Sequence, residues 1–303
     1  MKIRKQLILP VVIILILGLY LGINSTGKMN YKIPVFDAIE GENIKIIRIE
    51  GLKRLIELYS DDGIWKFNSN DLRAEPSKIS EMVSFLTDPE FIDMVSDTDN
   101  YQNYGLGDGD FITLKAWTNN KGEGNPAREL FLGNINTTGS FTFIRRPDNT
   151  SVFTVSGNLK EIFDVTQNDL IDKRVLNINI PDIDKIVISF SDSGYILEKT
   201  VGENNEDTWT ASNDLSVDIK KLEQNLRYLS NSRFNTYIDN TDTITPDSLF
   251  KIDLSGKDPD ESFIISEKND IGYYCESSFA GKSFILSENT GTQIIKMFRE
   301  LIE

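Results

Sequence analysis

Residues 42–50 read ENIKIIRIE, and residues 181–189 read PDIDKIVIS. Isoleucines recur in both stretches with the same spacing, and each equivalent pair is 139 residues apart. They are Ile44, Ile47 and Ile49 in the first stretch and Ile183, Ile186 and Ile188 in the second. Apolar residues at alternate positions predict a half-buried strand, and a pattern that returns along the chain indicates an internal repeat.

The repeat continues toward the C-terminus of each copy. Trp65 in DDGIWKF corresponds to Trp209 in NEDTWTA, 144 residues later, and the additional residues fall in the polar run Glu203–Asp207. At an offset of 143, Lys78, Ile79, Val83, Leu86 and Phe91 correspond to Lys221, Leu222, Leu226, Leu229 and Phe234. At an offset of 132, Glu129, Phe131 and Ser151 correspond to Glu261, Phe263 and Ser283. Such offsets are typical of two copies of one fold with insertions in loops.

The strands of each copy are predicted from short apolar runs separated by turns. In the first copy, Ile44–Ile49 and Leu55–Tyr59 are followed by the turn Asp61-Asp62-Gly63 and by Ile64–Phe67, which predicts hairpins. Further strands are expected at Ile112–Trp117, Glu129–Leu132, Phe141–Arg145 and Val152–Val155, and in the second copy at Leu249–Leu254, Ser262–Ser266, Gly272–Glu276 and Ser283–Leu286.

A main helix is predicted after the hairpin in each copy. Its apolar stripe comprises Ile79, Met82, Val83 and Leu86 in the first copy and Leu222, Leu226 and Leu229 in the second. Pro76 stands just inside the first helix, where a missing donor costs nothing, and Asp218 is the expected N-cap of the second. A short helix closes each copy, at Leu159, Ile162 and Phe163 and at Ile294, Met297, Phe298 and Leu301.

These elements predict an α+β protein with an N-terminal transmembrane helix and two tandem homologous domains. Each domain is an antiparallel sheet with one main amphipathic helix and a short closing helix. We expect a cytoplasmic basic stub at 1–6, a transmembrane anchor at 7–23, a linker at 24–35, repeat domain 1 at 36–170 and repeat domain 2 at 171–303. A domain of roughly 140 residues can bury a core of its own.

The N-terminal segment LILPVVIILILGLYLGI, residues 7–23, carries no charge and is at the short end for a membrane span. Lys2, Arg4 and Lys5 precede it, so we expect the N-terminus inside and the domains outside a bacterial inner membrane, in the periplasm or beyond the cell. The alternative is a cleaved signal peptide, but no clear A-x-A site follows the segment. We therefore expect an uncleaved single-pass anchor.

The composition restricts the chemistry. The chain of 303 residues has a net charge of −15, no histidine and one cysteine, Cys275. An imidazole base and a zinc site of histidine and cysteine are therefore excluded, as is an intramolecular disulfide. Residues 31–303 carry 28 basic and 47 acidic groups, a net charge of −19, which argues against nucleic acid as a partner.

Several motifs follow one another in a characteristic order. They are the I-x-x-I-x-I run at Ile44–Ile49, the G-x-W hairpin at Gly63–Trp65, Y-G-L at Tyr104–Leu106 and L-F-L-G-N at Leu130–Asn134, with DLIDKR at Asp169–Arg174 between the copies. With the N-terminal apolar segment, this order resembles domain-of-unknown-function family 4340 over residues 36 to about 300. The chain departs from the family at Gly107-Asp108-Gly109, where a proline-containing turn is usual, and its second copy lacks a clear Y-G-L.

The resemblance implies a setting and no catalytic residue, because none is assigned in the family. Such proteins are often encoded beside ABC transporters of the gliding-motility type and their large auxiliary membrane subunits. By this association alone, ABC transporter membrane subunits or an auxiliary protein are the expected partners.

Two acidic or glycine-rich stretches were weighed as ligand sites. Gly105–Asp110 reads GLGDGD, which does not fit G-x-G-x-x-G and has no following lysine, so we expect a flexible turn before a strand. Asp97, Asp99, Asp108 and Asp110 could gather around calcium, but the spacing does not fit an EF-hand loop. A solvated acidic loop is the favoured interpretation, and a noncanonical calcium site is the alternative.

The remaining candidates are interpreted as structural. Asp61 and Asp62 are a carboxylate pair in a turn, which favours hairpin chemistry over glycoside cleavage. Trp65 and Trp209 are expected at a repeated core position rather than on a sugar-binding platform. Cys275 is expected to be a buried small hydrophobe. Tyr273 and Tyr274, and Phe141 and Phe143 in the first copy, are expected in strands.

We therefore expect a non-catalytic, membrane-anchored extracytoplasmic protein, an accessory or interaction subunit of an ABC transporter-type envelope complex. No catalytic, cofactor-binding or metal-binding residue is nominated, and no cofactor is expected. The alternative is an extracytoplasmic ligand-binding module with its site between the two repeats, because domain interfaces commonly form pockets. A hydrolase that uses carboxylates in that cleft is the third hypothesis.

Overall fold

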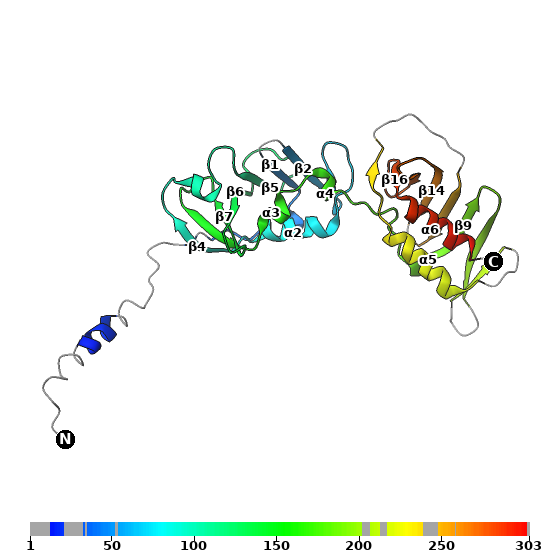
Figure 1. Ribbon diagram of the computed structural model, residues 1–303, viewed down its shortest axis with the longest axis horizontal. Helices are drawn as coiled ribbons and strands as arrows, with labels where there is room; N and C mark the ends of the chain where they lie inside the picture. Colours follow the sequence, from blue (N-terminus) through cyan, green and yellow to red (C-terminus); the bar gives the residue numbers. More distant parts are fainter. Residues whose placement is uncertain are drawn as a thin grey trace, which may run out of the picture.

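A computed structural model describes residues 13–20, 33, 35–51, 54–201, 207–212, 217–238, 248–257 and 259–301 of the chain. Residues 13–20 form a helix (Figure 1). The rest of the expected anchor at 7–23, the stub at 1–6 and most of the linker at 24–35 lie outside the described residues. Within the described part of the chain, no helix is long and apolar enough to cross a membrane.

The described chain forms two antiparallel sheets of eight strands each (Figure 1). The first contains β1 (Ile46–Gly51), β2 (Arg54–Asp61), β3 (Ile64–Phe67), β4 (Phe91–Ser96), β5 (Ile112–Trp117), β6 (Arg128–Ile135), β7 (Phe141–Arg145) and β8 (Val152–Ser156). The second contains β9 (Ile183–Phe190), β10 (Gly194–Val201), β11 (Asp207–Ala211), β12 (Thr236–Tyr237), β13 (Phe250–Gly256), β14 (Glu261–Lys268), β15 (Tyr273–Ser277) and β16 (Phe284–Leu286).

Helices follow the same strands in both halves. The first half contains η2 (Gly41–Asn43), α2 (Pro76–Thr87), η3 (Tyr101–Tyr104), α3 (Leu159–Phe163) and α4 (Gln167–Leu170). The second contains η4 (Ile180–Asp182), α5 (Ile219–Asn231) and α6 (Glu288–Arg299). Pro76 is in the first turn of α2, and the side chain of Asp218 caps α5 by accepting from two backbone N–H groups, so both sequence signals are confirmed.

The strand order proves the duplication at the level of topology. The first sheet has the order β3-β2-β1-β5-β6-β7-β8-β4, and adding eight to each number gives the order of the second, β11-β10-β9-β13-β14-β15-β16-β12. The α+β class with two helix-backed antiparallel sheets is therefore confirmed. The sequence did not predict β4 and β12, which follow the main helices and pair with β8 and β16 at one edge of each sheet.

The pairing registers confirm the equivalence of the hairpin tryptophans. Leu58 of β2 pairs with Phe67 in repeat 1, and Leu197 of β10 pairs with Ala211 in repeat 2. Leu58 and Leu197 differ by the 139 of the first strands, while their partners differ by the 144 of Trp65 and Trp209.

The expected equivalence at an offset of 132 is wrong by one residue. Leu130 of β6 lies opposite Leu114, as Phe263 of β14 lies opposite Ile252 on the strand equivalent to β5, which gives an offset of 133. A slip of one residue reverses the face of a strand. Phe263 is therefore buried on the helix side, whereas Phe131, its expected counterpart, is half-buried on the opposite face. The same reasoning moves the Ser151–Ser283 match, because β8 and β16 differ by 131.

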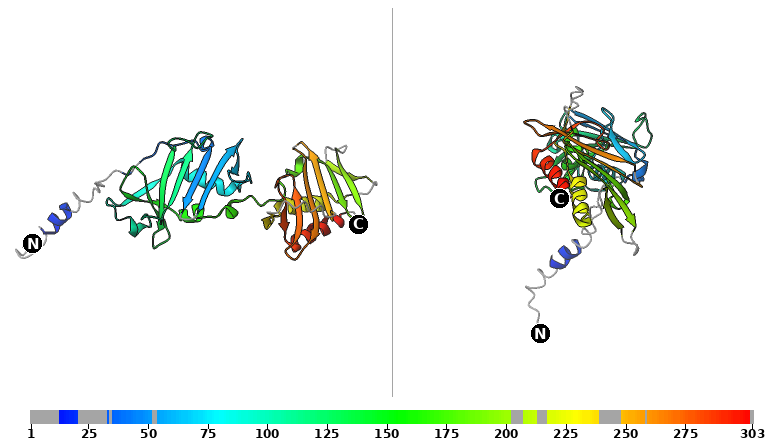
Figure 2. Two further views of the ribbon diagram at one scale, coloured as in Figure 1. Left: turned by 90° about the horizontal axis from the view of Figure 1, so that it is seen from above. Right: turned by 90° about the vertical axis from the view of Figure 1, so that its right-hand side faces the viewer.

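The helices cover one face of each sheet, with the core between them (Figure 2). Repeat 1 buries Ile79, Met82 and Leu86 of α2 against the sheet, and repeat 2 buries Leu222, Asn225, Leu226 and Leu229 of α5. Equivalent phenylalanines stack in both cores, Phe91 on Phe153 at 5.1 Å and Phe234 on Phe284 at 4.6 Å between ring centroids. The opposite face of each sheet carries no helix and is called the open face below.

The closing helix differs between the repeats. The offset of 131 from β8 continues through it, so that the buried Phe163 corresponds to Ile294 and the buried Leu170 to Leu301. In repeat 2 this stretch is the single helix α6, whereas in repeat 1 it is divided into α3 and α4. The expected short closing helix is therefore found in repeat 1 and is a helix of 12 residues in repeat 2.

Candidate functional site

The linker that joins the two repeats is hydrogen-bonded to an edge of each. On the first repeat, the Glu75 N–H donates to the Leu170 carbonyl at 2.7 Å, and Ala74 forms a bridge with Ile171. On the second, Arg174 forms a bridge with Arg233. The backbone from residue 170 to residue 177 therefore runs as a short extra strand from one repeat to the other.

A buried carboxylate lies in the middle of this linker. Asp172 is 2% exposed, and its backbone N–H donates to the Arg73 carbonyl of repeat 1. Its carboxylate accepts from the Arg174 Nε at 3.0 Å and from the Arg174 Nη2 at 2.6 Å, a bidentate pair. The Arg174 Nη1 donates to the Asn177 Oδ1 at 2.7 Å. Hydrogen bonding to Asp172 raises the pKa of Arg174, so this guanidinium is charged and fixed in place.

Both repeats contribute to the contacts of Phe279, which follows β15 and is buried. The Arg73 guanidinium of repeat 1 lies 4.7 Å from its ring centroid, and the Arg174 guanidinium of the linker lies 5.1 Å from it. Arginine over an aromatic face is attracted by the ring quadrupole. We call Arg73, Asp172, Arg174, Asn177, Glu261 and Phe279 the junction cluster.

Glu261 completes the junction cluster from the start of β14. Its carboxylate accepts from the Asn177 backbone N–H and, at 3.4 Å, from the Ser278 hydroxyl. Burial raises the pKa of Glu261, although these hydrogen bonds and the nearby arginines oppose the shift. Close by, Tyr237 packs against the cores of both repeats, and burial with the charge of Asp172 raises the pKa of its hydroxyl to about 12.

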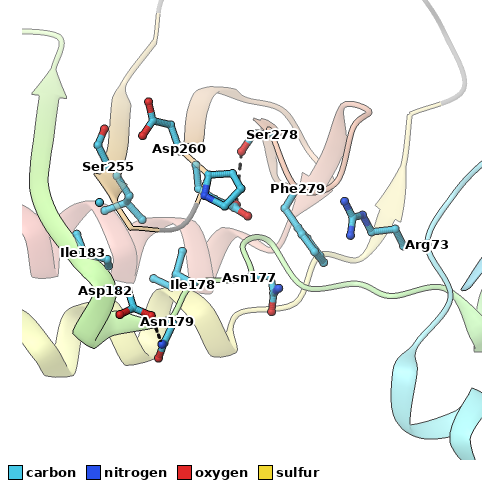
Figure 3. A pocket seen from close by; sticks show the side chains of 14 residues that line it. Arg73, Asn177, Ile178, Asn179, Asp182, Ile183, Ser255, Asp260, Ser278 and Phe279 are labelled. Atoms are coloured by element: carbon cyan, nitrogen blue, oxygen red, sulfur yellow. Dashed lines mark hydrogen bonds between the residues drawn. The ribbon is translucent and has the colours of Figure 1, made fainter. Parts of the chain in front are cut away.

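Two cavities flank the junction cluster and share Arg73, Asn177 and Phe279. The first, of about 400 Å³, lies against repeat 2 and includes Asp182, Asp260 and Glu261 in its wall (Figure 3). The second, of about 390 Å³, lies against repeat 1. Its wall consists of apolar Trp65, Pro76, Ile79 and Val83 beside Asp172 and Arg174.

The chemistry of this junction suits binding. Among the described residues, Arg73 makes no ion pair or side-chain hydrogen bond, so its donors remain available beside both cavities. The carboxylates and amides of the first cavity could hydrogen-bond a polar small molecule that carries hydroxyl or amino groups. No group of three or more acidic or cysteine side chains in the described part of the chain is arranged to hold a metal ion.

The two sequence motifs of the first repeat meet each other away from the junction. Gly105 has a φ of 64°, and a side chain there would overlap Asn134. Gly133 is equally close to the Tyr104 carbonyl and to Leu106. Gly105 to Gly107 are therefore buried rather than part of the expected flexible turn, and only residues 108–110 of the glycine-rich run are exposed. The corresponding stretch of repeat 2, residues 239–247, lies outside the described residues.

The other sequence candidates occupy structural positions. Asp61 ends β2 and pairs with Lys66 at 2.7 Å, and Asp62 has a φ of 49° in the hairpin turn. Trp209 is buried in the core of repeat 2, while its equivalent Trp65 is half-buried and lines the second cavity. Cys275 is buried in β15, where burial raises the pKa of its thiol, so the expected inert cysteine is confirmed.

Sequence reasoning found only part of the junction cluster. The motif DLIDKR contains Asp172 and Arg174, so its position between the copies was the available signal. Arg73, Glu261 and Phe279 were not nominated, because they lie in three separate turns that only the tertiary fold brings together.

Taken together, the fold and the junction define a tandem-repeat α+β protein whose two copies are joined through a polar linker. The family described as domain of unknown function (DUF4340) matches residues 65–249, more than half of the chain. The chain therefore belongs to this family. No curated protein and no solved structure matches it.

Proposed function

We propose that the chain is a non-catalytic, membrane-anchored extracytoplasmic protein that serves as an accessory subunit of an ABC transporter-type envelope complex. The observation that carries the proposal is the duplication of one helix-backed sheet, which offers a partner two related open faces on one chain. The absence of histidine from the sequence and the burial of Cys275 support contact rather than catalysis.

The N-terminal segment supports the membrane part of the proposal. Its described helix, residues 13–20, exposes seven large apolar side chains to between 48% and 67%. A helix that is apolar on all sides and packs against nothing is suited to a bilayer. The preceding basic residues place the N-terminus inside, so the repeats would face outward.

The open face of repeat 1 carries a surface suited to a protein partner. Arg145 lies between two aromatic rings, 4.5 Å from the Tyr101 centroid and 4.6 Å from the Phe131 centroid. Tyr104 packs edge-on against Phe143 at 4.9 Å beside them. These side chains are half-buried, and aromatic residues with arginine are enriched at protein interfaces.

The test is an in-cell cross-link of the tagged full-length chain, followed by purification in mild detergent. The proposal expects ABC transporter membrane subunits in near-equal amounts with the chain. A chain that lacks residues 7–23 is the matched control and should appear in the soluble fraction without them. Recovery of the full-length chain alone, or in the soluble fraction, would contradict the proposal.

A second candidate function is ligand binding at the junction, which the two shared cavities favour. Selective binding to the folded state raises the melting temperature in a saturable way. Free amino acids and monosaccharides are suitable probes, because the first cavity combines carboxylates, amides and one guanidinium. Arg73→Gln should abolish the shift, and Arg233→Gln, which changes an exposed arginine outside both cavity walls, should retain it. No saturable shift with any probe would reject this candidate.

A further inference from the structure

Each repeat has an apolar groove between its hairpin tryptophan and its main helix. In repeat 1 the walls are Trp65, Pro76, Ile79 and Val83, around about 390 Å³. In repeat 2 the equivalent residues Trp209, Ile219, Leu222 and Leu226 line about 260 Å³. The offsets of 144 for the tryptophans and 143 for the helices are those of the repeat itself, so the grooves are equivalent surfaces.

The groove of repeat 1 is covered by the segment that leads into repeat 2. Ile171 pairs with Ala74 at the groove edge, and Arg174 and Asn177 line the cavity with Phe279. This lead-in segment lies before β9 and belongs to the second repeat. Repeat 1 thus uses its groove to receive the lead-in segment of another repeat.

The groove of repeat 2 receives an equivalent chain only in part. Lys78 donates to the Asp169 carbonyl in repeat 1, and its equivalent Lys221 donates to the Glu300 carbonyl in repeat 2. Glu300 and Leu301 therefore correspond to Asp169 and Leu170, at the offset of 131. Beyond them, no described residue covers the groove as residues 172–177 and Phe279 cover that of repeat 1.

The edge of this second groove is also open. Val217 corresponds to Ala74, and its backbone makes no hydrogen bond with any described residue, whereas Ala74 pairs with Ile171. An extended segment could add at this edge as residue 171 adds in repeat 1.

The matching segment within this chain is the lead-in of repeat 1. At the offset of 139, residues 33–38 correspond to residues 172–177. Val35 stands at the position of Arg174 and is 88% exposed, so an apolar side chain points away from its own core.

The charges of the two surfaces are opposite. Exposed Asp37, Glu40 and Glu42 follow Val35 on the lead-in segment of repeat 1. Lys199 and Arg227 line the second groove, and Lys220 is exposed at the start of α5. Complementary charge favours encounter and fixes the register of a docked segment.

We propose that the Trp209 groove binds the lead-in segment of a second copy of this chain, residues 33–40, in a head-to-tail contact. The contact repeats between copies the arrangement that joins repeat 1 to repeat 2 within one copy. Because the two surfaces differ, the association is heterologous and can extend beyond a dimer.

The test uses differently tagged full-length chains in mild detergent, with engineered cysteines. Ser80 and Asn177 line the same cavity at the internal junction, and their equivalents are Glu223 and Ala38. Chains with Glu223→Cys and chains with Ala38→Cys should form a disulfide-linked pair when mixed, and neither should form one alone. The native Cys275 is buried and contributes little background.

Two control variants make the result decisive. Ser80→Cys is the matched control, because its groove is already covered within the chain, and it should not link to Ala38→Cys. Val35→Asp should weaken self-association in sedimentation by about tenfold, because it removes a buried valine from the contact. Leu55→Asp changes a leucine exposed to 66% outside the lead-in segment and both grooves and should have no effect. Monomers at all concentrations, or equal linking by Ser80→Cys, would overturn the proposal.

Discussion

The two repeats share one topology but place opposite charges at one equivalent position. Arg128 of β6 and Glu261 of β14 are 133 residues apart and begin equivalent strands. Arg128 donates to the Asp37 carbonyl of the segment that leads into repeat 1. Glu261 accepts from the Asn177 N–H of the segment that leads into repeat 2. The position therefore holds the lead-in segment in both repeats, and the backbone group available there decides whether a donor or an acceptor is used.

The surroundings of this position differ more than the task. Arg128 is 3% exposed, also donates to the Leu86 and Thr87 carbonyls at the end of α2, and lies over the Phe36 ring at 4.2 Å. Burial lowers the pKa of its guanidinium. Glu261 stands instead at the junction between the repeats. The comparison teaches that the junction uses a position that closes the interior of the preceding repeat.

The largest effect is expected from Arg128→Met. The change leaves the Asp37, Leu86 and Thr87 carbonyls without their buried donor, at a cost of about 4 kcal/mol in the free energy of unfolding. Urea unfolding followed by tryptophan fluorescence measures it, with Trp209→Phe in the background so that Trp65 and Trp117 report repeat 1. Arg146→Met removes the other guanidinium over Phe36, which is more exposed, and should cost under about 1 kcal/mol. Equal losses would refute the account of Arg128.

The second comparison concerns the core position Met82 in α2 and its equivalent Asn225 in α5. The Asn225 Nδ2 donates to the Met297 carbonyl of α6 at 2.8 Å, which is possible because α6 continues past this point. Met82→Asn should cost about 3 kcal/mol, since it buries an amide at a fully enclosed position. Asn225→Met should cost about 1 kcal/mol for the lost hydrogen bond. The same urea titration measures both, and a smaller loss for Met82→Asn would show that repeat 1 supplies a partner after all.

The sequence carried the architecture because its repeat was visible at aligned apolar positions. Ile47 and Ile186, or Ile79 and Leu222, could be matched without a structure because burial requires an apolar residue at each of them. The order of the family motifs led to the family that the match over residues 65–249 establishes. The register of β6 was misjudged because Phe131 and Phe263 look alike in sequence, although they lie on opposite faces.

The junction could be anticipated only as a location. Asp172 lies in a motif between the copies, but nothing in the sequence near Arg73 or Phe279 indicates that the two meet. Their contact depends on how two folded repeats are oriented, which is set by the linker hydrogen bonds. The same limit applies to β4 and β12, whose pairing partners lie more than 45 residues away in the chain.

A smaller effect is expected where the two main helices begin. Asp218 caps α5 through the Lys220 and Lys221 N–H groups, whereas its equivalent Glu75 makes no such bond at the start of α2. Asp218→Ala should therefore cost about 1 kcal/mol, and Glu75→Ala should stay within about 0.5 kcal/mol. Thermal unfolding of both variants measures the difference, and equal shifts in melting temperature would contradict it.

The smallest effect is a pH dependence at Glu261. Burial raises its pKa in the folded state, so the folded chain binds this proton more tightly than the unfolded chain does. The resulting stabilisation is fully present below the unfolded pKa, near about 4.3, and is lost as the pH rises through the higher folded value. Glu261→Gln removes the titration and can still accept from the Asn177 N–H, so its stability relative to the natural chain should rise by a few tenths of a kcal/mol, roughly, between pH 4 and pH 7. Melting temperatures across this range test it, with the exposed Glu90→Gln as the control that should show no such rise. A relative stability that falls with pH would mean that Arg73 and Arg174 stabilise the Glu261 carboxylate more than burial penalises it.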